Sequence, residues 1–231
     1  MTECTPEVQW AHNTAYRKAN HTADTWQGRT ACKKFTNVFL GDLAKNIFKK
    51  FILLHNPDTA NSLIEYDLIR ADDFRNSDQF DLKLTCQNEE CVIEVKSSGE
   101  KSTNNLMEIY NNRRIIINVG NVHQHYDCIY AQIMFIPENL AFFQNEDFVC
   151  TSLTDFSNQY VQDFLGQNIK AYIVGYASEP MQRAAVQNVI TMNNQNAGAK
   201  KRGYADLYIK DSKSPHLFLQ AIPKPCNNPS L

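Results

Sequence analysis

Apolar residues recur every three or four positions between residues 25 and 54, in the segment TWQGRTACKKFTNVFLGDLAKNIFKKFILL. The residues that share this spacing are Phe35, Val38, Phe39, Leu43, Ile47 and Phe51. Such spacing is typical of an amphipathic helix that buries one side. Asn56-Pro57-Asp58 follows, and proline cannot continue a helix. We therefore expect a long helix that ends just before Pro57.

Two later segments alternate between apolar and polar residues. The runs QFDLKLTC (79–86) and CVIEVKSS (91–98) are separated by the polar QNEE, which predicts a β-hairpin. If the turn is centred between Gln87 and Asn88, Asp81 lies directly opposite Glu94. The apolar side chains of both strands then share one face, while Asp81, Glu94 and Lys96 lie away from it.

The rest of the chain indicates further strands and helices. Residues 62–70 are expected to form a strand or a short irregular segment, and residues 71–78 a turn-rich link. Strands are expected at 113–119, 126–137, 171–177, 205–210 and 216–222, and helical segments at 106–114, 141–167 and 181–195. The run 126–137 is apolar at nearly every position, which favours a buried central strand. The pattern predicts an α/β fold, with a mixed central sheet flanked by helices.

Composition narrows the class of protein. The chain has 231 residues, of which 43% are hydrophobic and 21% charged, as in an ordinary globular protein, and we expect one domain over 1–231. Its net charge of -2 gives no global signal of a polyanionic partner. Seven scattered cysteines without C-x-x-C spacing argue against a disulfide framework or a zinc ribbon and favour reduced thiols. No signal peptide or long apolar run is visible, so we expect a cytoplasmic protein without a membrane partner.

The predicted hairpin brings two carboxylates and an ammonium together. Directly opposed residues have Cβ atoms roughly 4.5–5.5 Å apart, so Asp81 and Glu94 would repel each other unless a cation lay between them. Mg²⁺, for which Mn²⁺ can substitute, is the natural candidate. It would polarise a phosphodiester and supply a bound water of lowered pKa, while Lys96 orients or deprotonates that water and offsets developing charge. The sequence therefore predicts metal-dependent phosphodiester hydrolysis.

The spacing of Asp81, Glu94-Val95-Lys96 and the preceding helix resembles the PD-(D/E)xK nuclease superfamily. The similarity covers roughly residues 29–137, with Phe80 in place of the nominal proline. Segment FLGDLAKNIFKKF is similar to the family's first core helix, which often carries an acid that reaches the metal, and Asp42 has that position. The resemblance implies a restriction-endonuclease-like core, with metal ligands from Asp81, Glu94, the Val95 backbone carbonyl and Asp42.

The acid-x-lysine triplet alone is weak evidence. Chance supplies about 1.6 such triplets in this composition, and three occur, at 81–83, 94–96 and 211–213. One alternative register uses Asp67, Asp72 or Asp73 as first acid and Asp81-Leu82-Lys83 as the motif. Another alternative is an ordinary hairpin with a solvated charged face.

A stand-alone chain of this size most resembles a prokaryotic type II restriction endonuclease, which implies a homodimer that cuts a short site in double-stranded DNA. Residues 138–225 would then supply DNA recognition or dimer contacts. The candidate DNA-binding residues are Lys101, Arg113, Arg114, Lys200, Lys201 and Arg202. For the last three, in the loop AGAKKRG, a solvated loop is an equal alternative. The rival functions are a repair, recombination or phage-defence nuclease of the same superfamily, and an inactive DNA-binding module.

Overall fold

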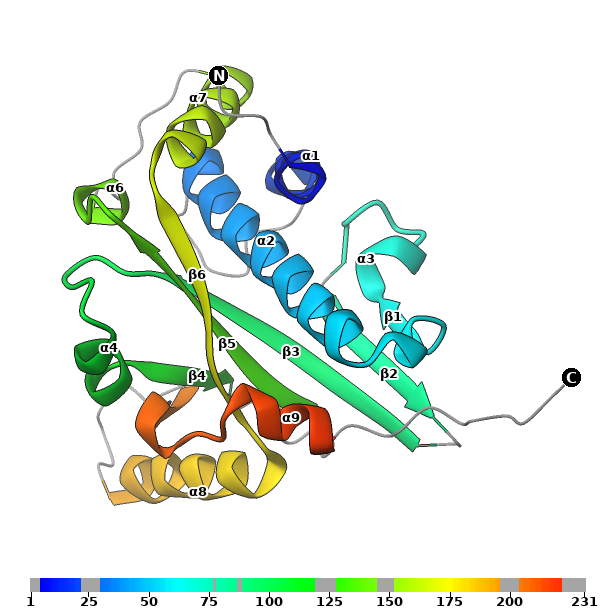
Figure 1. The fold of residues 1–231 in the computed structure, drawn as a ribbon, viewed down its shortest axis with the longest axis vertical. Helices are drawn as coiled ribbons and strands as arrows, with labels where there is room; N and C mark the ends of the chain where they lie inside the picture. Colours follow the sequence, from blue (N-terminus) through cyan, green and yellow to red (C-terminus); the bar gives the residue numbers. More distant parts are fainter. Residues whose placement is uncertain are drawn as a thin grey trace, which may run out of the picture.

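The computed structural model describes residues 5–21, 30–76, 78–86, 89–118, 128–144, 152–195 and 204–221. Its centre is a five-stranded sheet of order β1-β2-β3-β5-β6 (Figure 1). These strands are β1 (Leu63–Glu65), β2 (Leu82–Cys86), β3 (Glu89–Gly99), β5 (Cys128–Pro137) and β6 (Ile169–Ala177). Because β3 and β5 are parallel and the other neighbours antiparallel, the sheet is mixed. The predicted α/β class with a mixed central sheet flanked by helices is confirmed.

The hairpin of β2 and β3 has the predicted register. Leu82 pairs with Ile93 and Leu84 with Cys91. Leu82, Leu84 and Ile93 are fully buried, because the alternation of the two strands directs every second side chain to the same face. The polar residues between them are left on the other face or at the strand end.

β5 is the central buried strand, as its composition predicted. It lies between β3 and β6, and all but one of its residues are buried. Its residues divide between the two faces of the sheet: Ile133 and Phe135 contact one core, and Tyr130 and Met134 the other. The sheet therefore separates two hydrophobic layers.

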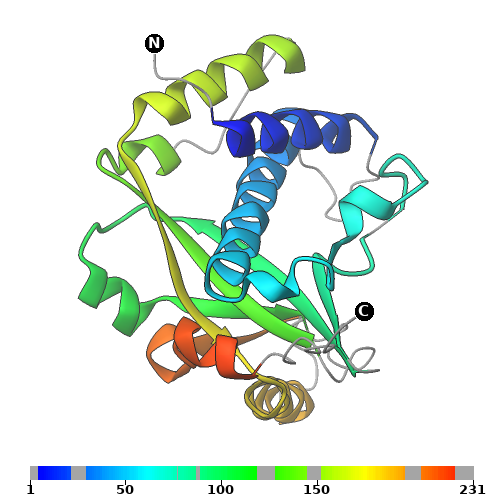
Figure 2. The same ribbon diagram turned by 45° about the vertical axis from the view of Figure 1, so that its right-hand side comes forward.

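One face of the sheet is covered by α1 (Pro6–His21), α2 (Ala31–His55) and α7 (Leu153–Gly166) (Figures 1 and 2). The Thr30 side chain accepts a hydrogen bond from the Lys33 amide and so caps the start of α2. The helix ends before Pro57, as predicted. Phe35, Phe39 and Phe48 point inward from α2 and are at most 1% exposed, and Tyr160 and Phe164 of α7 pack edge-on against this aromatic row.

The other face carries a second core under α4 (Leu106–Asn112), α8 (Glu179–Gln195) and a two-stranded sheet of β4 (Arg114–Asn118) and β7 (Tyr204–Tyr208). Ile115, Ile117 and Ala205 are directed inward and fully buried. The shorter elements are a 3-10 turn at Pro57–Thr59, α3 (Tyr66–Ile69), α6 (Ala141–Gln144), a 3-10 turn at Ile209–Asp211 and α9 (Pro215–Ala221).

Two sequence expectations differ from the structure, and one helix was not expected. The segment 216–222, expected as a strand, lies mostly in α9, because Pro215 suits the first position of a helix and Phe218 packs against Phe48 and Tyr176. Helix α1 was not predicted, since its buried face consists mainly of alanines and carries little hydrophobic signal. Cys32 is disulfide-bonded, against the expectation of reduced thiols, whereas Cys91 and Cys128 form no disulfide.

Within the described part of the chain, no helix is long and apolar enough to cross a membrane.

Candidate functional site

Asp81 immediately precedes β2 and turns its side chain towards β3. Its Oδ2 atom accepts a hydrogen bond from the Val95 backbone N–H at 2.7 Å. The register pairs Leu82 with Ile93, so Asp81, the residue just before β2, lies at the end of the hairpin beside Glu94 and Val95. The structure thus brings Asp81 to the segment Glu94-Val95-Lys96.

Glu94 and Lys96 share one face of β3, where they contact each other. The Lys96 Nζ atom lies 2.5 Å from Glu94 Oε1. The Lys96 and Glu94 side chains are 32% and 22% exposed, so a ligand in solution can reach both. The ring of Tyr130, which pairs with Glu94 across β3 and β5, lies 5.6 Å from the Lys96 ammonium, within the range of a cation–π contact.

The two carboxylates interact electrostatically. Burial, reinforced by the nearby Glu94 carboxylate, raises the pKa of Asp81 to about 7, although Lys45 and Lys96 act in the opposite direction. Burial by itself would lower the pKa of Lys96, but the adjacent Glu94 outweighs it and raises that pKa. Lys96 is therefore an ammonium at neutral pH, which favours charge stabilisation and water orientation over proton abstraction.

The donor atoms around Asp81 fit a hard cation. A strand residue directs its N–H and C=O to the same neighbouring strand, so the Val95 carbonyl lies on the side where its amide donates to Asp81. Two carboxylates and a carbonyl are oxygen ligands of the kind Mg²⁺ accepts, with water and substrate filling the other positions. In the described ranges, no three or more His, Cys, Asp or Glu residues form a group that could hold a metal ion. The candidate site thus offers two side-chain carboxylates to a cation.

Asp42 belongs to a different cluster, here called the α1–α2 ion network and consisting of Lys18, Asp42, Lys45, Glu65 and Asp67. The Asp42 Oδ1 atom lies 2.9 Å from Lys18 Nζ and 3.4 Å from Lys45 Nζ. Burial raises the pKa of Asp42 despite both lysines. The structure does not group Asp42 with Asp81 and Glu94. Its role as a metal ligand stays a prediction, and Lys45 connects the two clusters only through its charge.

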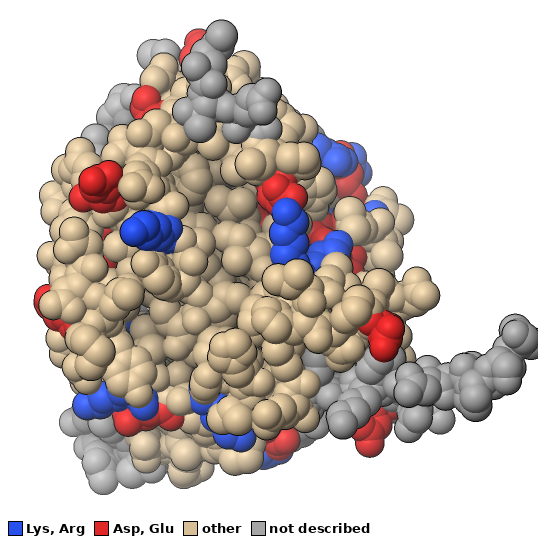
Figure 3. Space-filling view, in the orientation of Figure 1, with Lys and Arg blue, Asp and Glu red and all other residues tan. Residues whose placement is uncertain are grey.

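The rest of the α1–α2 ion network closes around the two lysines. Asp67 Oδ2 accepts from Lys18 Nζ at 2.7 Å and also from Lys45 Nζ, and Glu65 Oε1 lies 3.4 Å from Lys45 Nζ. The side chains of Asp42, Lys45, Glu65 and Asp67 are at most 5% exposed. Further acidic and basic side chains lie side by side on the surface over α1 and α3 (Figure 3), where Arg17 pairs with Asp73.

The alternative motif register has a different environment in the structure. Lys83 is 3.0 Å from Glu90 near the hairpin turn, and Asp72 binds Arg70. Asp67 lies inside the α1–α2 ion network. The candidate first acids of this register are therefore held by basic side chains outside the motif, and Lys83 is held by Glu90. Glu94, by contrast, pairs with the lysine of its own triplet, which favours the site at Asp81, Glu94 and Lys96.

Three of the predicted DNA-binding residues lie together. Lys101, Arg113 and Arg114 line one pocket at the end of β3. The other three, Lys200, Lys201 and Arg202, lie outside the described residues.

Sequence reasoning missed the lysines of the α1–α2 ion network and the ring below Lys96. Lys18 and Lys45 are distant in sequence from the hairpin, and only the packing of α1 on α2 brings them together. Tyr130 could have been found, because a parallel strand after the hairpin must set one of its residues beside Glu94.

No protein-family model, curated protein or solved structure matches this chain, so its function is inferred from the fold and from the geometry of this site.

Proposed function

We propose that the protein is a Mg²⁺-dependent endodeoxyribonuclease whose site is built on Asp81, Glu94 and Lys96. The observation that carries the proposal is the hydrogen bond from the Val95 amide to Asp81, which holds one carboxylate against the acid-x-lysine segment of the adjacent strand. This arrangement is the one that the resemblance to the PD-(D/E)xK nucleases requires.

Each residue has a role that follows from its environment. Asp81, Glu94 and the Val95 carbonyl would hold the cation, which supplies Lewis-acid polarisation of the phosphodiester. Lys96, held by Glu94 and charged at neutral pH, orients the attacking water and stabilises the negative charge that develops on phosphate oxygens. The ring of Tyr130 limits where the ammonium can lie.

By the same resemblance, the proposed biological role is that of a type II restriction endonuclease acting as a homodimer on double-stranded DNA. A repair or phage-defence nuclease of the same superfamily would use the same residues on a different DNA structure.

A cleavage assay tests the proposal. Supercoiled plasmid incubated with the protein is expected to be cut in Mg²⁺ or Mn²⁺ and to stay intact in EDTA. Discrete fragments of linear DNA would support the restriction role, and cutting confined to branched or single-stranded substrates would support the repair role. Binding without cutting under any divalent cation would contradict the enzyme and favour an inactive DNA-binding module.

Metal binding should depend on pH. The pKa of Asp81 is raised from 3.8 to about 7 in the folded, metal-free chain, so the cation must displace a proton below that pH. The apparent Mg²⁺ affinity is expected to fall by about tenfold per pH unit below 7 and to level off above it. Without metal, this group makes the folded state less stable as pH rises from about 4 through 7.

Mg²⁺ titrations at pH 6, 7 and 8, followed by the shift in Tm, measure this dependence. Asp81→Asn should weaken metal binding and remove this proton linkage. An Mg²⁺ affinity independent of pH over the same range would contradict the assignment of Asp81 as a ligand.

A further inference from the structure

A pocket of about 190 Å³ lies at the end of β3, outside the cluster of Asp81, Glu94 and Lys96. It is lined by Ser98, Glu100, Lys101, Arg113, Arg114 and Met134, among others. Three of these are cations and one is an acid. The pocket thus gathers positive charge on a protein whose overall charge is -2.

The pocket continues the face of β3 that carries the proposed catalytic residues. Ser98 lies two residues beyond Lys96 and so points to the same side of the sheet, where its neighbour on β5 is Met134. Two residues of β-strand span about 6.6 Å, which is close to the axial rise of two nucleotides in duplex DNA. A DNA strand bound at Lys96 therefore extends to the pocket within a few phosphates.

The acid in the pocket has its acceptors occupied. Arg113 donates from Nε to Glu100 Oε2 and from Nη2 to Oε1, both at 2.6 Å, and Oε1 also accepts from the amides of Lys101 and Ser102. Burial is outweighed by these bonds, which lower the pKa of Glu100 to about 2, so it remains an anion. Glu100 therefore fixes the Arg113 guanidinium, whose Nη1 group is left for a further acceptor.

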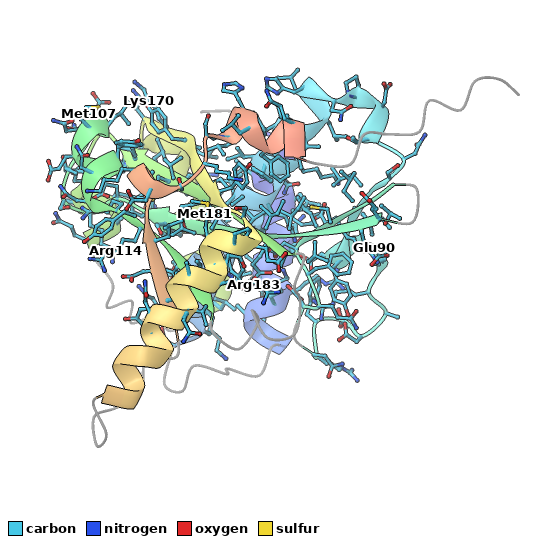
Figure 4. The ribbon with its side chains drawn as sticks, turned by 90° about the horizontal axis from the view of Figure 1, so that it is seen from below. Glu90, Met107, Arg114, Lys170, Met181 and Arg183 are labelled. Atoms are coloured by element: carbon cyan, nitrogen blue, oxygen red, sulfur yellow. The ribbon has the colours of Figure 1, made fainter. Side chains whose placement is uncertain are left out.

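Arg114 and Ser98 also bring hydrogen-bond donors to the pocket. Arg114 stacks on the Tyr208 ring at 4.3 Å and bonds to Asp206, and its side chain is still 38% exposed. Ser98 Oγ accepts a hydrogen bond from the Gln132 side chain at 3.3 Å, so its own hydroxyl hydrogen can be donated elsewhere. In Figure 4, Arg114 lies on the same side of the molecule as Met107 of α4, away from Glu90 beside the hairpin turn.

We propose that this pocket binds a backbone phosphate of the DNA strand that is cut, a few nucleotides from the scissile bond. A ligand that contacts two guanidiniums, an ammonium and a hydroxyl must supply several acceptor oxygens and negative charge. A phosphodiester supplies both, and it does so whatever the base of its nucleotide. The inference rests on the proposed nuclease function and adds a second contact, which fixes the register of the strand over Lys96.

The test measures DNA affinity as a function of salt. Two duplexes of equal length and different base sequence are each titrated in EDTA with the wild-type chain, with Lys101→Ala/Arg114→Ala, and with the control Lys50→Ala. Lys50 is a 65% exposed lysine on α2, on the other face of the sheet. Arg113 is left unchanged, because its loss would leave the buried Glu100 carboxylate uncompensated. Thermal unfolding of each variant checks that it is folded.

The double variant is expected to lower the slope of log affinity against log salt by about two and to weaken binding to all sequences alike. Lys50→Ala should leave the slope unchanged. A slope equal to the wild-type value in the double variant would overturn the inference, as would a loss confined to one base sequence.

A second measurement locates the phosphate. Duplexes carrying one neutral methylphosphonate are compared at each position near the cut. One substitution within a few nucleotides of the scissile bond should weaken wild-type binding and have no effect on the double variant. Absence of any such position would overturn the inference even if the wild-type chain cuts plasmid in Mg²⁺. Conversely, a chain that never cuts but whose salt slope falls in the double variant would retain the phosphate site and lose the nuclease function.

Discussion

Lys96→Ala is expected to slow DNA cleavage by roughly 10²–10³-fold or more, while DNA affinity in EDTA stays close to that of the wild-type chain. The Lys96 ammonium is held 2.5 Å from Glu94 Oε1 beside the proposed metal ligands, where phosphate oxygens gain charge during hydrolysis. It is a single cation at one point of a long strand contact, so its loss removes little of the energy of binding. Transition-state stabilisation is lost, and ground-state binding is retained.

The measurement is the single-turnover cleavage rate of a defined duplex, together with its Kd by fluorescence anisotropy. Lys83→Ala is the matched control, since Lys83 is also the lysine of an acid-x-lysine triplet but pairs with Glu90 near the turn. It should cut at nearly the wild-type rate. The reverse result, with Lys83 essential and Lys96 dispensable, would support the alternative motif register and refute the proposed site.

Lys45→Met is expected to lower the free energy of unfolding by about 3–5 kcal/mol. The Lys45 side chain is 2% exposed and its ammonium lies among the carboxylates of Asp42, Glu65 and Asp67. Methionine fills a similar volume, so the loss arises from charge: the buried carboxylates lose their shared counterion. Lys18 still pairs with Asp42 and Asp67, but Lys49 is then the remaining lysine bound to Glu65.

Urea unfolding at several pH values measures this effect, with Lys50→Met on the same helix as the control. Lys50 is 65% exposed in its pair with Glu7, so its replacement should change stability by no more than about 0.5 kcal/mol. Burial raises the pKa of Asp42 and Lys45 opposes that shift, so without Lys45 the defect should shrink as pH falls and Asp42 becomes protonated. A loss below about 1 kcal/mol at pH 7 would show that the network tolerates removal of this charge.

Much of the fold could be predicted because it depends on local patterns. The alternation in 79–86 and 91–98 determines both the hairpin and its register, since a shift of one residue would expose Leu82, Leu84 and Ile93. The spacing of apolar residues predicted α2, and Pro57 predicted its end. Helix α1 escaped prediction because alanines at Ala11, Ala15 and Ala19 carry little hydrophobic signal, although they allow α1 to pack closely on α2.

The local sequence by itself determined that Asp81 comes beside Glu94 at the end of the hairpin, because Asp81 immediately precedes β2, Glu94 lies in β3, and burial sets the register of the two strands. Only the tertiary structure decided how Asp42 is used: packing of α1 on α2 brings Lys18 beside it, and neither residue signals the other along the chain. The same holds for the pocket of Lys101, Arg113 and Arg114. The end of β3, the start of β4 and Met134 of β5 meet there, and charge at a site depends on every element that packs around it.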